Sequence, residues 1–248
     1  MRMALISDIH GNATALEAVL ADVQRQAADA VVCLGDMATL GPQPARVLEM
    51  LADLRCPCIL GNHEAALFQP AKALDYHIGL PLVDTLLWCA QQLTAEHLAF
   101  LQACVPAFSL PLGSADALLC FHGSPRSNVD QILAQTPAEE LDRVLAGHSA
   151  TIMAGGHTHI QLLRQHHGRY LVNPGSVGGA FLAPVADAAQ PTLLPWAEYA
   201  IVSWVGASAG IDFRRVSFDI GRFLQIVDQS DLPMKAWWRQ QYMRANAG

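Results

Sequence analysis

Five short motifs rich in Asp, His and Asn occur between residues 8 and 159, each where an apolar run ends. Carboxylate, amide and imidazole groups are ligands for divalent transition metals, and this set lacks a thiolate. The mixture therefore favours Mn, Fe, Zn or Co over a structural zinc knot. Together the motifs offer enough ligands for two metal ions, which indicates a hydrolase. They read Asp8-Ile9-His10, Gly35-Asp36, Gly61-Asn62-His63-Glu64, His122-Gly123 and Gly156-His157-Thr158-His159.

Two of the motifs place paired ligands two residues apart, Asp8 with His10 and His157 with His159. Residues i and i+2 point the same way at an extended strand end, so each pair would share one side of the chain. Taken singly, each motif also has a structural interpretation, because Gly-Asp and Gly-Asn are common in turns. Five of the ten histidines fall in these motifs, however, and their repeated placement after apolar runs favours a metal site.

The segments between the first motifs alternate between strands and helices. Apolar runs at 4–7, 31–34 and 59–60 predict strands, and helical spacing predicts a helix after a capping box beginning at Thr14 and another after Pro44. This order predicts parallel strands with helices packed outside, and ligands gather at the carboxyl ends of such strands. Further strands are predicted at 117–121, 151–154, 170–172, 199–204 and 213–218.

Two regions differ in character from the rest. Residues 64–113 are rich in Ala, Leu and Gln and show no strand pattern, which predicts a helical insertion that could be a substrate lid or an oligomer interface. The tail over 221–248 contains Trp237, Trp238 and Tyr242 and predicts a terminal helix packed on the domain, with a partner surface as the alternative. We therefore expect one domain over 1–220 followed by this tail.

Composition limits the class of protein. The 248 residues are 52% hydrophobic and 15% charged, which is enough for a substantial core. A net charge of −7 without a Lys/Arg run disfavours extended nucleic acid as a partner, but bound cations would still attract a small phosphorylated substrate. We find no signal peptide and no apolar run long enough for a membrane span. A cytoplasmic location with reduced cysteines is expected, Cys33 and Cys120 lying in the core.

As an ordered set, the motifs resemble those of the calcineurin-like metallophosphoesterases. The run from Asn173 to Ser176 is similar to the smaller bacterial and archaeal branch, and the resemblance covers about residues 3–220. It implies an α/β fold, a four-layer α-β-β-α sandwich, with a dinuclear metal centre. One metal would take Asp8, His10, Asp36 and His159, and the other Asp36, Asn62, His122 and His157, with Asp36 bridging.

The resemblance also implies a mechanism and further roles. A metal-bridging hydroxide would attack a phosphate ester, while His63 and Asn62 would contact the phosphoryl group and His63 would protonate the leaving oxygen. The alternative for His63 is a hydrogen-bonded histidine beside the ligands. Arg126 is the candidate to grip a substrate phosphate, with a solvated loop arginine as the alternative. Family members that dephosphorylate proteins carry an arginine shortly after Gly-Asp, and residues 35–41 contain none.

Three functions remain open from the sequence. The leading hypothesis is hydrolysis of a small phosphodiester or nucleotide-like substrate. The second is a phosphomonoesterase or phosphoprotein phosphatase, and the third is a metal-bound scaffold that binds a protein partner without catalysis. The sequence decides neither the identity of the two metals, among Mn, Fe, Zn and Co, nor whether the protein forms a homo-oligomer. His166 and His167 lie in a polar stretch that predicts a surface turn.

Overall fold

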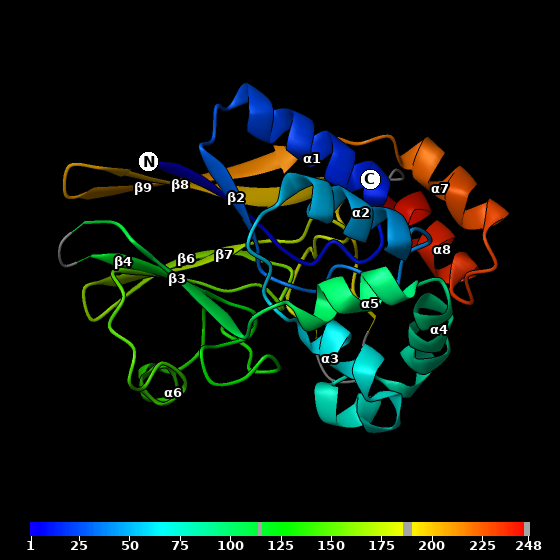
Figure 1. Ribbon diagram of the computed structural model, residues 1–248, viewed down its shortest axis with the longest axis horizontal. Helices are drawn as coiled ribbons and strands as arrows, with labels where there is room; N and C mark the ends of the chain where they lie inside the picture. Colours follow the sequence, from blue (N-terminus) through cyan, green and yellow to red (C-terminus); the bar gives the residue numbers. More distant parts are fainter. Residues whose placement is uncertain (114–115, 186–189, 246–248) are drawn as a thin grey trace.

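The computed structural model describes residues 1–113, 116–185 and 190–245. Its strands form two mixed sheets (Figure 1). In the first sheet, β1 pairs in parallel with β2 and antiparallel with β8, which pairs antiparallel with β9. The order across this sheet is β2 (Ala30–Cys33), β1 (Arg2–Ile6), β8 (Ala197–Val205) and β9 (Ser208–Val216).

The second sheet has a parallel centre and antiparallel edges. Strands β4, β5 and β7 run in parallel, while β3 and β6 pair antiparallel with β4 and β7. Because these strands run in parallel, the carboxyl ends of β4 and β5 lie at the same end of the sheet. The order is β3 (Ala107–Pro111), β4 (Ala117–Phe121), β5 (Ile152–Ala154), β7 (Arg169–Pro174) and β6 (Gln161–His166).

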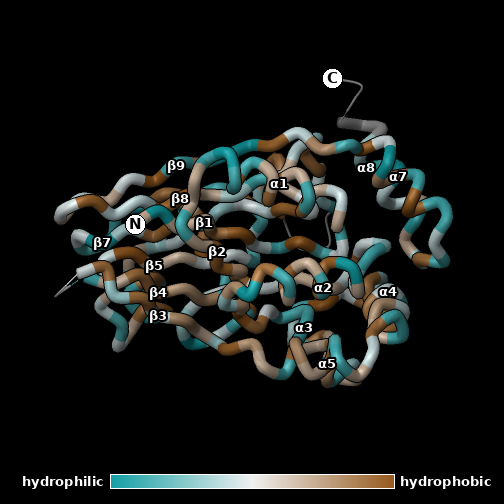
Figure 2. The backbone as a smooth tube through the Cα atoms, turned by 45° about the horizontal axis from the view of Figure 1, so that its top comes forward, coloured by the Kyte–Doolittle hydropathy of each residue, from teal (hydrophilic) through white to brown (hydrophobic). Residues whose placement is uncertain are grey.

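The two sheets pack face to face between outer helices, giving the four-layer α-β-β-α sandwich that the resemblance implied. Alternate residues of a strand face opposite sides. In β1, Ala4 and Ile6 pack against α1 (Ala13–Arg25) and α2 (Pro44–Leu54), whereas Leu5 faces the second sheet. On the far side, α6 (Ala138–Val144) covers the second sheet. Hydrophobic residues recur along the strands of both sheets (Figure 2).

The remaining helices gather at one end of the sandwich (Figure 1). The segment between β2 and β3 also contains four further helices. They are α3 (Asn62–Phe68), the 3-10 helix η1 (Pro70–Tyr76), α4 (Leu80–Gln91) and α5 (Ala95–Gln102). The tail forms α7 (Ile220–Gln229) and α8 (Lys235–Ala245), and residues 246–248 lie outside the described part. Both Trp238 and Tyr242 are buried. No described helix is long and apolar enough to cross a membrane.

Several local expectations were wrong. The segment 64–113 is not wholly helical, because β3 occupies its end as a short edge strand closed by Pro111. The third strand at 59–60 is reduced to isolated bridges at Cys58 and Ile59. Helix α1 begins two residues earlier than a capping box at Thr14 would place it, since the Asn12 side chain accepts the Ala15 N–H at 3.0 Å. The prediction also missed β6 and α6.

The loop after β7 lies directly on the loop after β1. The Gly178 N–H donates to the Asp8 carbonyl at 2.9 Å, and Ser176 Oγ donates to the same carbonyl at 2.7 Å. A Cβ atom at Gly178 would lie 1.9 Å from the carbonyl oxygen of Ile9. Only glycine allows the two backbones to come this close, and the contact fixes where Asp8 begins its loop.

Gly178→Ala should therefore destabilise the protein by about 3 kcal/mol, a Tm loss on the order of 10 °C, because the clash is with backbone that cannot rotate away. Thermal unfolding followed by circular dichroism measures this. Gly210→Ala in β9 is the matched control, since its new Cβ would meet Ser203 at an ordinary 3.6 Å. Equal Tm values for the two variants would contradict the interpretation.

Candidate metal centre

The candidate ligands come from loops that follow strand ends. The Asp8 and His10 loop follows β1, the Asp36 loop follows β2, and His122 follows β4. His157 and His159 follow β5, whereas Asn62 and His63 open helix α3. The two sheets therefore deliver their loops to one place, and the residues expected there from the sequence are brought together.

The ligand loops have an unusual backbone. Asp8, His10, Asp36, His157 and His159 all have positive φ, between 47° and 68°. Residues other than glycine rarely adopt this left-handed region, and clusters of such strain mark functional sites. The side chains of Asp8 and His10 thus meet through a tight left-handed loop, and not through the extended strand end that the i, i+2 argument assumed.

A first cluster contains Asp8, His10 and His159. His159 Nε2 lies 3.4 Å from Asp8 Oδ1 and 3.0 Å from His10 Nε2. Three ligand atoms from two loops, 149 residues apart in sequence, therefore point to one position. Burial lowers the pKa of His10 well below its ordinary value, which keeps this imidazole in the neutral form that binds metals.

A second cluster contains Asp36, His122 and His157. His122 Nε2 lies 3.4 Å from Asp36 Oδ2, and Asn62 Oδ1 lies 2.9 Å from His122 Nε2 and 3.1 Å from His157 Nδ1. Burial lowers the pKa of His157 to about 3, so this ring is neutral as well. The amide oxygen of Asn62 thus joins the imidazoles, as expected from its motif.

The Asp36 carboxylate lies between the two clusters. Its Oδ2 atom is 3.8 Å from His10 Nε2 on one side and 3.4 Å from His122 Nε2 on the other. Burial alone would raise the pKa of Asp36, but His122 and His63 hold it well below its usual range. An ionised carboxylate between two ligand sets is the geometry that a bridging ligand requires.

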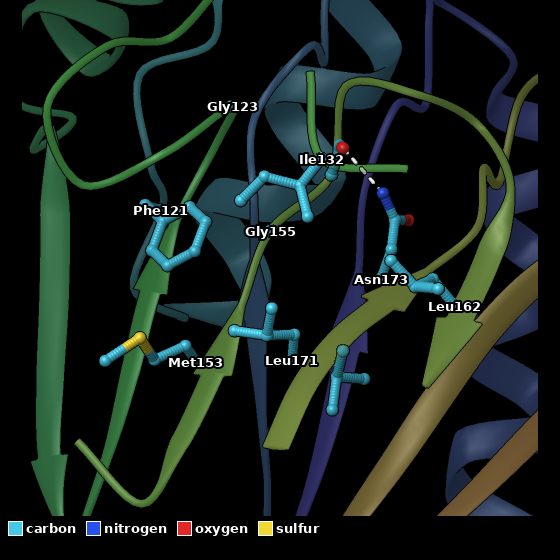
Figure 3. A pocket seen from close by; sticks show the side chains of 10 residues that line it. Phe121, Gly123, Ile132, Met153, Gly155, Leu162, Leu171 and Asn173 are labelled. Carbon is cyan, nitrogen blue, oxygen red and sulfur yellow. Dashed lines mark hydrogen bonds between the residues drawn. The ribbon is translucent and has the colours of Figure 1, made fainter. Parts of the chain in front are cut away.

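Backbone carbonyls orient two of the ligand rings. His122 Nδ1 lies 2.7 Å from the Leu34 carbonyl oxygen, and His159 Nδ1 lies 2.7 Å from that of Gly179. A hydrogen bond from Nδ1 fixes the tautomer and leaves the Nε2 lone pair free for a cation. Asn173 contacts the loop that carries His157 and His159, where its Nδ2 donates to the Gly156 carbonyl at 2.6 Å (Figure 3).

The donor set fits a bound cation. Asp8 Oδ1 and His157 Nε2 are buried, and neither has a hydrogen-bond partner in the described part of the chain. An unpaired buried polar atom costs about 1–3 kcal/mol, more when it is charged. Asp8 belongs to the first cluster and His157 to the second. Asp8 Oδ1 lies 3.4 Å from His159 Nε2, so a cation in the first cluster would use a lone pair that the described protein leaves unpaired. In the second cluster, His157 Nδ1 is the atom that lies beside Asn62 Oδ1.

Glu64 holds the Asp36 loop from below, a role that the sequence analysis missed. Its carboxylate is fully buried and accepts N–H bonds from Asp36, Met37 and Ala38 at 2.8, 2.7 and 3.2 Å, and from Gly61 at 3.2 Å. The Gly61 bond is the glutamate half of a capping box at the start of α3, since the N-cap glycine has no side chain to return a bond. A glutamate three residues after the start of a helix is a sequence signal for that box.

Thr39 is a second residue that the sequence did not reveal. Its Oγ1 atom lies 2.9 Å from His63 Nδ1 and 3.4 Å from His10 Nδ1. The hydroxyl therefore joins the ring expected to face the substrate to a ring of the first cluster. A threonine in an ordinary loop carries no pattern from which this contact could be predicted.

Arg126 lies on the loop after His122 but is not free. Its guanidinium pairs with Asp130 at 2.7 and 3.2 Å, and 41% of its side chain is exposed. A small pocket in the second sheet is lined by Phe121, Met153 and Leu171 (Figure 3). None of the candidate ligands lines this pocket, although its wall includes Gly156, the neighbour of His157.

Comparison with known proteins identifies the family of this chain. The calcineurin-like phosphoesterase superfamily domain matches residues 1–192, and the chain belongs to this superfamily. The resemblance read from the ordered motifs is thereby confirmed.

Known proteins are similar to this chain over most of their length. An uncharacterized protein from Methanocaldococcus jannaschii is 28% identical over 191 residues, which cover 71% of this chain and 76% of the relative. The structure of a metallophosphoesterase from Sphaerobacter thermophilus is 28% identical with a TM-score of 0.70, covering 94% of this chain and 95% of its own. A hypothetical protein from Pyrococcus horikoshii OT3 has the same fold, with 20% identity, a TM-score of 0.77 and 94% coverage of both chains.

Glu64→Ala should destabilise the protein by about 3 kcal/mol, because four backbone N–H groups in the interior lose their carboxyl acceptor. The amount of metal bound at the two clusters on either side of Asp36 should fall as well, since the Asp36 loop is no longer held in place. Denaturant unfolding and elemental analysis measure the two effects. Glu17→Ala is the control: its exposed pair with Arg222 should contribute no more than about 1 kcal/mol. Full metal content in Glu64→Ala would refute the assigned role.

Proposed function

We propose that this protein is a dinuclear metal-dependent phosphoesterase that hydrolyses a small phosphodiester or nucleotide-like substrate. The observation that carries the proposal is the position of the Asp36 carboxylate between two clusters of candidate ligands, with Asp8 Oδ1 of the first cluster buried and unpaired in the described residues. Asp8, His10 and His159 would hold one ion, and Asn62, His122 and His157 the other, with Asp36 shared. Two bound cations would make water acidic enough to supply a nucleophile near neutral pH and would offset phosphoryl charge.

His63 is the residue that we assign to proton transfer. It is 8% exposed, and its Nε2 atom lies 3.9 Å from Asp36 Oδ2. Its Nδ1 atom faces the Thr39 hydroxyl, so the ring is held with Nε2 directed toward the clusters. A general acid must lie within hydrogen-bond reach of the leaving oxygen, and the position of this ring beside both candidate ligand sets supports that role.

The charge around the site favours a diester over a monoester. A phosphomonoester dianion needs more compensating positive charge than a diester monoanion. Arg126, the substrate-binding candidate of this loop, already pairs with Asp130 and would contact a phosphate only by exchanging that partner. Residues 35–41 also lack the arginine of the protein phosphatases. Both observations support a small diester as the substrate.

A hydrolysis screen tests the proposal. Protein stripped of metal and refilled with Mn, Fe, Zn or Co should hydrolyse bis(p-nitrophenyl) phosphate faster than p-nitrophenyl phosphate. The Asp36→Asn variant should lose both bound metal and activity, because it lacks the carboxylate that we expect the two ions to share. Activity on monoesters alone would overturn the substrate class. A protein that is inactive with every metal and both esters would instead support a scaffold that binds a partner.

His63→Ala should lower kcat by about 10²–10⁴-fold while metal content stays unchanged, as expected for loss of a general acid. Thr39→Val should lower kcat by about 3–10-fold with little change in KM, because the isosteric side chain removes the hydroxyl contacts with His63 and, at longer range, with His10. Thr39→Ser keeps the hydroxyl and should restore the rate. If Thr39→Ser were as slow as Thr39→Val, methyl packing and not the hydrogen bond would explain the loss.

A further inference from the structure

A second set of metal-type ligands lies outside the Asp36 clusters. His166 Nε2 and His167 Nε2 approach the same oxygen, Asp142 Oδ1, at 2.8 and 2.9 Å. Their ring centroids are 4.2 Å apart, and all three ligand atoms lie within 4.8 Å of one another. Asp142 belongs to α6, whereas the histidines end β6 and begin the turn to β7. The cluster therefore joins a helix to a hairpin.

The turn explains how adjacent histidines can point to one atom. Successive side chains of a strand normally face opposite sides. His166 pairs with Arg169 across the hairpin, and the two residues between them, His167 and Gly168, have φ values of 48° and 75°. Positive φ at both central residues is the backbone of a tight hairpin turn. The turn brings the His167 ring back beside that of His166, at the cost of a left-handed backbone at a non-glycine residue.

We propose that Asp142, His166 and His167 form a peripheral metal site that binds a Zn²⁺ ion. Two imidazoles and one carboxylate, with water in the fourth position, make a tetrahedral zinc ligand set. Bonds of about 2.0–2.1 Å place tetrahedral ligand atoms about 3.3 Å apart. The N···O distances of 2.8 and 2.9 Å need to open by only about 0.5 Å, which small side-chain rotations supply.

The exposure of the three side chains suits such a site. His166 is 8% exposed and held by the hairpin, while His167 is 64% and Asp142 54% exposed, so an ion reaches them from solvent. Of the nearby cations, Arg143 pairs with Glu140 and Arg169 donates to the His148 carbonyl at 2.8 Å. In the described residues, neither guanidinium pairs with Asp142.

The site is remote from the Asp36 clusters. Strand β6 begins two residues after His159 and ends at His166, and its six residues span about 20 Å. In Figure 1, α6 lies beneath the second sheet, away from helices α3 to α5. A zinc ion here would cross-link α6 to the hairpin and stabilise the folded state, because it binds that state and not the unfolded chain. It would leave the chemistry at Asp36 unchanged.

His167→Asn is the decisive variant. Asparagine before glycine is favoured in this turn, so the fold is retained while the imidazole is lost. Equilibrium dialysis of the full-length chain against Zn²⁺, followed by elemental analysis, should show one fewer zinc equivalent than in the unsubstituted protein. Asp142→Asn should show the same loss. The rise in Tm on adding zinc should be smaller in both variants by about 5 °C at a hundred-fold excess over Kd.

His148→Asn is the matched control, because this histidine belongs to no ligand cluster in the described residues and its carbonyl contact with Arg169 is kept. It should bind as much zinc as the unsubstituted protein. The same comparison in an Asp36→Asn background separates this site from the proposed catalytic centre, since the loss caused by His167→Asn should persist there. Equal zinc content in all variants, or an equal loss in His148→Asn, would overturn the proposal.

Discussion

A single buried carboxylate, Asp36, organises the functional end of this molecule. Its Oδ2 atom lies within 3.9 Å of the Nε2 atoms of His10, His63 and His122, which come from three different segments. In the dry interior such a charge is stable only if its partners are held in place. The Glu64 carboxyl accepts the Asp36 backbone N–H, and the backbone N–H of His63 donates to Asp36 Oδ1 at 3.0 Å. The same contacts that satisfy the carboxylate therefore place the histidines around it.

The left-handed loops are the cost of that arrangement. Five candidate ligands have positive φ, and each such backbone is less stable than a helical or extended one. Glycines allow neighbouring segments to pack closely against these loops. A Cβ at Gly61 would lie 2.1 Å from Asp36 Oδ1, and one at Gly156 would lie 1.9 Å from Ser7 Oγ. Loops locked in this way lose little freedom when an ion binds. More of the binding free energy is then available for affinity.

The sequence was most informative where chemistry depends on residue type and order. The motif residues from Asp8 to His159 were predicted to converge from their types and their order along the chain. The structure brings them together. This prediction was possible because it did not require the backbone conformation of the loops. The route of convergence was not predictable: the Asp8 loop is left-handed and not extended, and its conformation depends on contacts with a loop about 170 residues away. β3 was missed because a five-residue edge strand ending in proline carries too short a pattern. Thr39 was missed because its role exists only beside His63.

The last part of the chain matters more to the site than its position in sequence suggests. The superfamily match ends at residue 192, yet β8 and β9 complete the first sheet, and β8 is the antiparallel neighbour of β1. In the tail, Trp238 Nε1 donates to the Leu40 carbonyl at 2.9 Å, directly beyond Thr39 in the Asp36 loop. The Tyr242 hydroxyl donates to the Gly178 carbonyl at 3.4 Å, on the loop that supports Asp8. Because α8 donates to a backbone carbonyl of each segment, it connects the Asp36 loop to the loop that supports Asp8, from a part of the chain beyond the superfamily match.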